Sequence, residues 1–254
     1  MIFFLKFVIS FFISLNLVAR DVGETEITTE DGIEVYQDEK YYLLKKNVKI
    51  VSDNFILNAD YVKIKFNENM YDIIELNAVG NVIFISENFD VKGKGETLNF
   101  IVDIEKIKIE GLNSELLTDD IQMYSDGSIE VNNIKGDFYI IGSNSKLIDE
   151  TVYIEGENID GVFIEANKKK EINFLNVIDK EISYVKNNET EMYAKKINFD
   201  NATSLIQLSD NVTIIRNEEK ITGDYGTLDT KNNSYKIKSR NTKKVKAIII
   251  NNDQ

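Results

Sequence analysis

Apolar and polar residues alternate in short bursts along most of this chain. From residue 25 onward, apolar side chains recur at every second position, as in VKIKF at 62–66, LNF at 98–100 and YKI at 235–237. A period of two is typical of β-strands with one buried face and one wet face. No segment after residue 24 shows the 3.6-residue stripe of an amphipathic helix. We therefore predict an all-β fold built from antiparallel strands.

Short polar groups separate the bursts and mark the turns. Examples are SDN at 52–54, NEN at 67–69, SDG at 125–127 and KNN at 231–233. Asn, Asp and Gly are the residues that tight turns favour, and the chain contains no proline that could take their place. The spacing of these groups predicts strands joined by tight turns.

A repeat of 34 residues lies within the alternation. The stretch NVKIVSDNF begins at Asn47, NVIFISENF begins 34 residues later at Asn81, and NVTIIRN begins at Asn211. Asn tolerates the left-handed backbone that most residues resist. We predict that these three residues occupy corners of the chain and that the valine after each one resumes an inward-facing strand.

A second element recurs in the same register. The stretch ADY at 59–61 corresponds to GDY at 223–225, and GDF at 136–138 looks like a further copy. The number of copies between residues 115 and 205 stays open. An ordinary β-sandwich is the alternative to a repeat, because alternation alone makes strands look alike.

Stacked copies of such a unit bury apolar surface continuously, whereas a single hairpin buries too little to be stable. In either arrangement, one set of apolar residues should share the inner face. These residues are Val48, Ile50, Val62, Ile64, Phe66, Val82, Phe84, Leu98, Phe100, Val212, Ile214 and Leu228.

The charge balance argues against a nucleic-acid partner. The chain carries 43 acidic and 30 basic side chains, for a net charge of −13, whereas phosphate binding needs clustered Lys and Arg. The longest basic run, KKK at 168–170, lies in a turn-like stretch. We predict that it is a solvated loop.

The residue types that most often perform chemistry are missing. Histidine and cysteine are both absent, which excludes disulfides, thiolate nucleophiles, imidazole bases and Cys/His zinc sites. The stretch KGKGET at 92–97 lacks the spacing of a phosphate loop and is expected to be a bulged strand. Asp60, Asp137 and Asp224 recur without the dense carboxylate run of a calcium loop. We expect no catalytic residue, metal or cofactor, and interpret these aspartates as caps of turns and strand ends.

The first 19 residues, MIFFLKFVISFFISLNLVA, have one early cation, Lys6, and then an apolar run to Val18. This pattern is typical of an export signal. We predict a signal peptide at 1–19, with an uncleaved anchor as the alternative, and one β domain at 25–250.

Three stretches resemble the OstA-like domain family, to which the periplasmic lipopolysaccharide-transport protein LptA belongs. They are AVGNVIFIS at 78–86, LNADYVKIKF at 57–66, and ITGDYGTLDTKNNSYKIKS at 221–239, which KKVKAIII follows. The resemblance covers most of 30–250. It implies an incompletely closed β-jellyroll, in which two antiparallel sheets form a V whose apolar interior holds acyl chains. The inner-face residues given above would then line a lipid-binding groove.

The resemblance also implies a role. The chain would be a non-enzymatic periplasmic bridge that passes lipopolysaccharide, or a similar acylated lipid, from the inner to the outer membrane. Its partners would be an anchored inner-membrane component and an outer-membrane translocon. The alternatives are an inner-membrane-anchored relative in the same pathway and a repetitive surface or structural protein with a solid core.

The two ends of the domain predict the docking surfaces. The last strand contains Val245, Ala247, Ile248 and Ile250 and has no proline, so it is poorly protected against pairing with another chain. The first strand contains Ile33 and Val35 among acidic neighbours. We predict that the last strand of one copy pairs head to tail with the first strand of the next copy, or with a related partner. This pairing would also bring lysines of the last strand near those acidic residues.

Overall fold

The structure is a computed structural model, and it describes residues 24–70, 72–88, 90–166, 169–217, 219–240 and 244–249. Over these ranges it consists of β-strands, turns and bends without a helix, which confirms the all-β prediction. It follows that no helix in these ranges has the length and apolarity to cross a membrane. The predicted signal peptide at 1–19, and also Lys168 and Ile250, lie outside the described residues.

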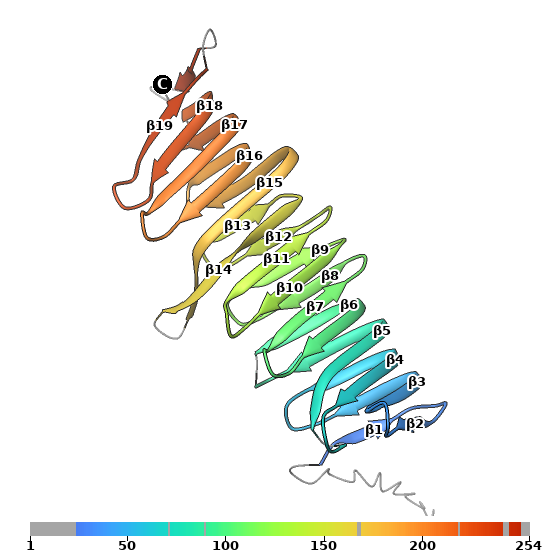
Figure 1. Ribbon diagram of the computed structural model, residues 1–254. Helices are drawn as coiled ribbons and strands as arrows, with labels where there is room; N and C mark the ends of the chain where they lie inside the picture. The colour runs from blue at the N-terminus through green and yellow to red at the C-terminus, as the bar shows by residue number, and fades with distance from the viewer. Residues whose placement is uncertain are drawn as a thin grey trace, which may run out of the picture.

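The strands lie side by side across the long axis of an elongated molecule and follow one another from one end to the other (Figure 1). Their bounds are β1 Glu26–Thr28, β2 Ile33–Tyr36, β3 Tyr41–Val51, β4 Ile56–Phe66, β5 Ile73–Ser86, β6 Val91–Ile101, β7 Lys106–Glu110, β8 Ser114–Leu117, β9 Gln122–Ser125, β10 Ser128–Asn132, β11 Asp137–Ile141, β12 Lys146–Ile148, β13 Val152–Glu155, β14 Asn158–Ala166, β15 Lys169–Asn187, β16 Thr190–Asp200, β17 Leu205–Arg216, β18 Glu219–Asp229, β19 Ser234–Lys238 and β20 Lys246–Ile249.

The long strands bend near their middle, so that each contributes to two sheets. The register of β5 against β6 shifts between Val79 and Val82, and equivalent shifts interrupt the pairing of β3 with β4 and of β17 with β18. Beyond the shift the two halves find different neighbours. One part of β6 pairs with β7 and the other part with β8, and these two strands continue separately to β10 and β9.

Two antiparallel sheets therefore run the length of the molecule. The first sheet contains β2, β7, β10, β11, β14, β19 and one half of each long strand, and the second contains β1, β8, β9, β12, β13, β20 and the other halves. The bends join the sheets along one side. Among the described residues, no strand pairing joins them along the other side, where the hairpin tips lie. This is the incompletely closed, V-shaped β-jellyroll that was predicted.

The corners confirm the role predicted for asparagine. Asn47, Asn81 and Asn211 have φ angles of 51°, 49° and 59°, and each lies at a register shift between the two halves of its strand. A left-handed residue at this point turns the strand from one sheet into the other. A chain that crosses between sheets in mid-strand also distinguishes this fold from the ordinary β-sandwich considered above.

The three-residue element with a central aspartate (ADY, GDF and GDY) takes the same structural position in two of its three predicted copies. Asp60 in β4 and Asp224 in β18 both lie at register shifts, where Asp60 accepts a hydrogen bond from the Asn81 side chain and Asp224 accepts one from the Arg240 amide. Asp137 instead begins β11, directly after a hairpin in which Gly136 has a φ of 77°. The third copy of this element was therefore wrong, because the same three-residue pattern also suits a strand start.

The core lies between the two sheets as one continuous apolar layer. All the residues predicted for the inner face are buried, with none more than 6 % exposed, and all except Phe66 belong to this continuous layer. The stretch 92–97 lies in β6 as a strand, and a side chain on Gly93 or Gly95 would come within 2.5 Å of Ile109. The lack of a side chain at these two glycines therefore makes space for the Ile109 side chain.

Candidate functional site

Two cavities lie between the sheets toward the open side of the V. The narrow cavity, of about 40 Å³, is lined by residues from β5 to β15. The wide cavity, of about 390 Å³, begins next to it and extends toward the C-terminal end of the molecule. Ligand pockets of proteins commonly occupy 300–1,000 Å³, so the wide cavity has the size of a binding site and the narrow one has the size of a constriction.

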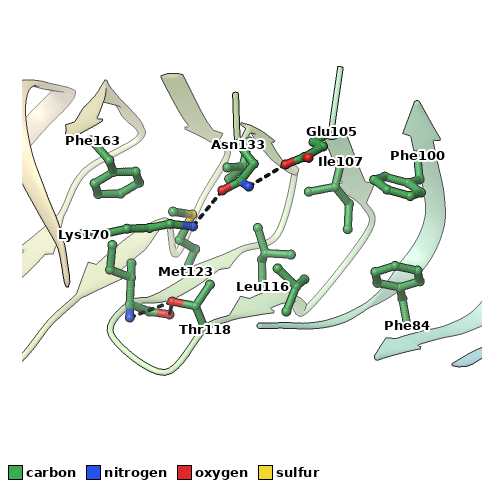
Figure 2. A pocket seen from close by; sticks show the side chains of 13 residues that line it. Phe84, Phe100, Glu105, Ile107, Leu116, Thr118, Met123, Asn133, Phe163 and Lys170 are labelled. Atoms are coloured by element: carbon green, nitrogen blue, oxygen red, sulfur yellow. Dashed lines mark hydrogen bonds between the residues drawn. The ribbon is translucent and has the colours of Figure 1, made fainter. Parts of the chain in front are cut away.

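The narrow cavity is an apolar slot with a polar edge (Figure 2). At one end Phe84 of the second sheet faces Phe100 of the first, with ring centroids 5.7 Å apart. At the other end the Lys170 side chain runs beside Phe163 and donates a hydrogen bond of 3.0 Å to Asn133. The Asn133 amide in turn donates to Glu105 at 2.6 Å.

The wide cavity has an apolar wall and a charged rim. Its apolar lining consists of Val152, Ile172, Leu175, Val185, Ile197, Phe199 and Ile206. Its polar lining consists of Asp120, Asp149, Glu150, Thr151, Lys169, Lys170, Glu171, Asn187, Asn201 and Thr230. Such an arrangement suits a molecule with an apolar body and a polar end, because each part finds a surface of its own kind.

The structure brings the predicted groove residues together in the interior, but only two of them line a cavity. Phe84 and Phe100 line the narrow cavity, whereas the other ten are packed in the core and line neither cavity. The wide cavity is built entirely from residues that were not predicted. Several of these, such as Leu175, Val185 and Ile197, follow the same period-two alternation, which was the signal available in that region.

The predicted edge residues lie at the two ends of the molecule. Ile33 and Val35 are in β2, which pairs with β3, and both are nearly half exposed. Ala247 and Ile248 are in β20, which pairs with β18, while Val245 lies just before this strand. All three of these C-terminal residues are exposed.

Two groups of residues on the outer surface have shifted pKa values. On the second sheet the Tyr184 ring lies 5.9 Å from Tyr153 and 4.8 Å from Tyr193. Burial, and a hydrogen bond to Glu191, raise the pKa of Tyr193 to about 12. On the first sheet, hydrogen bonding to Lys65 is the main cause that lowers the pKa of Glu75. In the described ranges, no group of three or more acidic side chains is placed to hold a metal ion.

Comparisons with known proteins leave the chain without an assigned family. No protein-family model matches it, and no curated protein matches it in sequence. One solved structure that matches is the crystal structure of LptH, the LptA-homologous periplasmic component of the lipopolysaccharide transport device from Pseudomonas aeruginosa, at 11 % identity, over 90 % of this chain and 96 % of that chain, with a TM-score of 0.23. An identity and a TM-score of this size support no conclusion about family or function.

Proposed function

We propose that this protein is a non-enzymatic carrier that holds the acyl chains of lipopolysaccharide, or of a similar acylated lipid, between its two sheets. In this role it bridges the inner and outer membranes across the periplasm. The sequence resemblance described above supports the choice of lipid and compartment. The export signal that the sequence predicts at 1–19 supports the same compartment.

The observation that carries the proposal is the shape of the apolar interior. One continuous apolar layer runs between two sheets that are joined along one side, and it opens into a cavity of about 390 Å³ with a charged rim. A closed barrel would have to unfold to admit a chain from the side. Two sheets that are joined along one side only can admit one through the other side, where no strand pairing closes the described residues.

The energetics suit sliding better than tight capture. Each methylene group that leaves water contributes about 0.8 kcal/mol, and this contribution does not depend on direction. An acyl chain therefore gains nearly the same free energy at successive positions along the interior. The polar head can remain in water at the open side, and directional movement would be driven by other components.

The ends of the molecule fit assembly with further copies or with related partners. In the described part of the chain, β1 and β2 pair with β3 alone, and β19 and β20 pair with β18 alone. Stacking that continues both sheets brings β2 against β19 and β1 against β20. This differs from the direct pairing of β2 with β20, because those two strands belong to different sheets.

The second candidate is a structural protein with a solid core. The N-terminal third favours it, because the interior there is closely packed: Leu44, Ile50, Leu57 and Val62 are all fully buried. Native mass spectrometry of the protein purified under mild conditions separates the two candidates. A carrier retains mass increments that match whole acylated lipids, whereas a solid core yields the bare chain.

The anchored relative in the same pathway makes a different prediction. N-terminal sequencing of the mature protein should start near Arg20 for a periplasmic bridge. An intact Met1 would favour the anchored form.

A further inference from the structure

Two lysines join the sheets across the open side of the V. Lys169 and Lys170 begin β15, in the part that pairs with β14 in the first sheet. The Lys169 ammonium lies 3.2 Å from the Glu150 carboxylate, and the Lys170 amide donates a hydrogen bond of 3.4 Å to Asp120. Glu150 and Asp120 lie in hairpin tips of the second sheet, between β12 and β13 and between β8 and β9.

These contacts stand where the two cavities meet. Lys170 lines both cavities, and Lys169, Asp120 and Glu150 all line the rim of the wide one. The Lys170 ammonium also reaches Asn133 at the edge of the narrow cavity (Figure 2). A chain that passes along the open side from one cavity to the other must pass beneath these groups or displace them.

Contacts between the sheets recur on the open side toward the C-terminal end. Arg216 donates to the Asn233 carbonyl at 3.2 Å, and the Tyr235 hydroxyl donates to Glu219 at 3.0 Å. Arg216 and Glu219 flank a tip of the second sheet, whereas Tyr235 lies in β19 of the first sheet and Asn233 directly precedes that strand. The wide cavity therefore lies between two sets of contacts that join the two sheets on the open side of the V.

We propose that Lys169 and Lys170, with Asp120, Asn133 and Glu150, form a strap that gates the passage of an acyl chain between the two cavities. The proposal rests on the proposed function, because a gate needs a chain to pass. For Lys169 and Lys170 it replaces the interpretation of the basic run as a solvated loop, since a solvated loop makes no set of contacts with the opposite sheet.

The strap is weak enough to open. The Lys169 side chain is 57 % exposed and that of Glu150 is 78 % exposed, and ion pairs this open to water contribute little to stability. Salt screens such a pair further. The strap therefore favours the closed arrangement while still yielding to a chain that gains apolar contacts on the other side.

A charge-swap experiment tests the gate. The probe is a monoacylglycerol that carries a nitrobenzoxadiazole fluorophore, because its neutral head responds to the strap and not to the charge of the rim. Stopped-flow fluorescence measures its uptake by the full-length protein. Lys169→Glu should speed uptake about two- to fivefold, the factor that corresponds to one exposed ion pair. The double variant Lys169→Glu with Glu150→Lys re-forms the pair and should return uptake to the parent rate.

Lys180→Glu is the matched control. Lys180 also forms an exposed pair, with Glu157 at 2.6 Å, but on the joined side of the V, so this variant should take up the probe at the parent rate. If the probe binds normally and Lys169→Glu behaves like Lys180→Glu, the strap is not a gate, although the carrier function stands. If no variant and not even the parent binds the probe, the carrier function fails and the strap proposal fails with it.

Discussion

Asn47, Asn81 and Asn211 show how single residues shape this fold. Each adopts a left-handed backbone at the point where its strand passes from one sheet into the other. The sequence predicted this role, because asparagine before an inward valine recurs in strand-like surroundings. For most other side chains a left-handed conformation costs about 1–2 kcal/mol per residue.

Replacing Asn211 measures that cost. This residue is exposed, so a change of side chain acts mainly through the backbone. We expect Asn211→Val to lower the free energy of unfolding by about 1–2 kcal/mol, as measured by urea denaturation. Asn211→Gly is the control and should stay close to the parent, because glycine accepts this conformation. Equal stability of the two variants would mean that the corner is not under conformational constraint.

The tyrosine row on the second sheet predicts a dependence of stability on pH. The folded state raises the pKa of Tyr193 to about 12, compared with about 10 in an unfolded chain, so the folded state holds this proton more tightly. The resulting stability is complete below about pH 10 and is lost as the pH rises to about 12. Denaturation midpoints at about pH 9 and about pH 11.5 should therefore differ more in the parent than in Tyr193→Phe. The same loss in both would exclude this contribution.

At the scale of elements, the middle of the chain shows what the sequence did not reveal. There the long strands give way to short ones, and Asn-Val no longer marks the corners. Two corners are formed instead by GLNS at 111–114 and GSNS at 142–145, 31 residues apart. In each, the serine hydroxyl donates to the carbonyl of the glycine three residues earlier, at 2.8 and 2.7 Å.

The reason for the missed corners is physical. A left-handed turn between sheets can be built from two consecutive left-handed residues, of which the second is asparagine, or from a glycine, an asparagine and a hydrogen-bonding serine. Gly111 and Gly142 have φ angles of 123° and 133°, a region that requires glycine. The search for Asn-Val could not find this second solution. Most apolar residues of the wide cavity lie in β15 and β16, and they stayed unassigned for a related reason, because the bends of these strands at 178–183 and 193–196 contain no Asn-Val either.

On the outer faces of the strands, asparagine side chains form rows of hydrogen bonds. On the first sheet, the Asn198 amide donates to Asn176, and the Asn176 amide donates to Asp160, both at 2.8 Å. A similar row joins Asn99, Asn77 and Glu75. Such cross-strand pairs stabilise neighbouring strands. They keep the outer face polar while the inner face remains apolar.

The C-terminal edge strand carries a prediction about assembly. Ile248 and Ile249 are 44 % and 63 % exposed on β20, and lysine on an edge strand opposes pairing with another chain. We expect the double variant Ile248→Lys with Ile249→Lys to weaken self-association by about tenfold or more, as measured by sedimentation velocity. The control is Leu112→Lys with Ile134→Lys, at positions of similar exposure away from the ends. Equal weakening in the control would point to net charge instead of the edge.

At the scale of the whole molecule, the fold separates two tasks. The outer faces carry the polar ladders and ion pairs, and the net charge of −13 favours solubility. The inner faces form one apolar layer that is closed on one side by corners and held on the other side by scattered contacts. Alternation predicted which side chains face inward. It could not predict where the interior is filled and where it is hollow, because that depends on the packing of side chains that lie far apart in the sequence.

Photo-crosslinking at two adjacent positions of β6 tests most directly whether the interior carries the lipid. Phe100 lines the narrow cavity, whereas Asn99 lies on the outer face, where its side chain donates to Glu75 and Asn77. With a benzophenone amino acid at either position and purified lipopolysaccharide as the probe, the lipid should label position 100 strongly and position 99 weakly. Equal labelling at both positions would contradict the account.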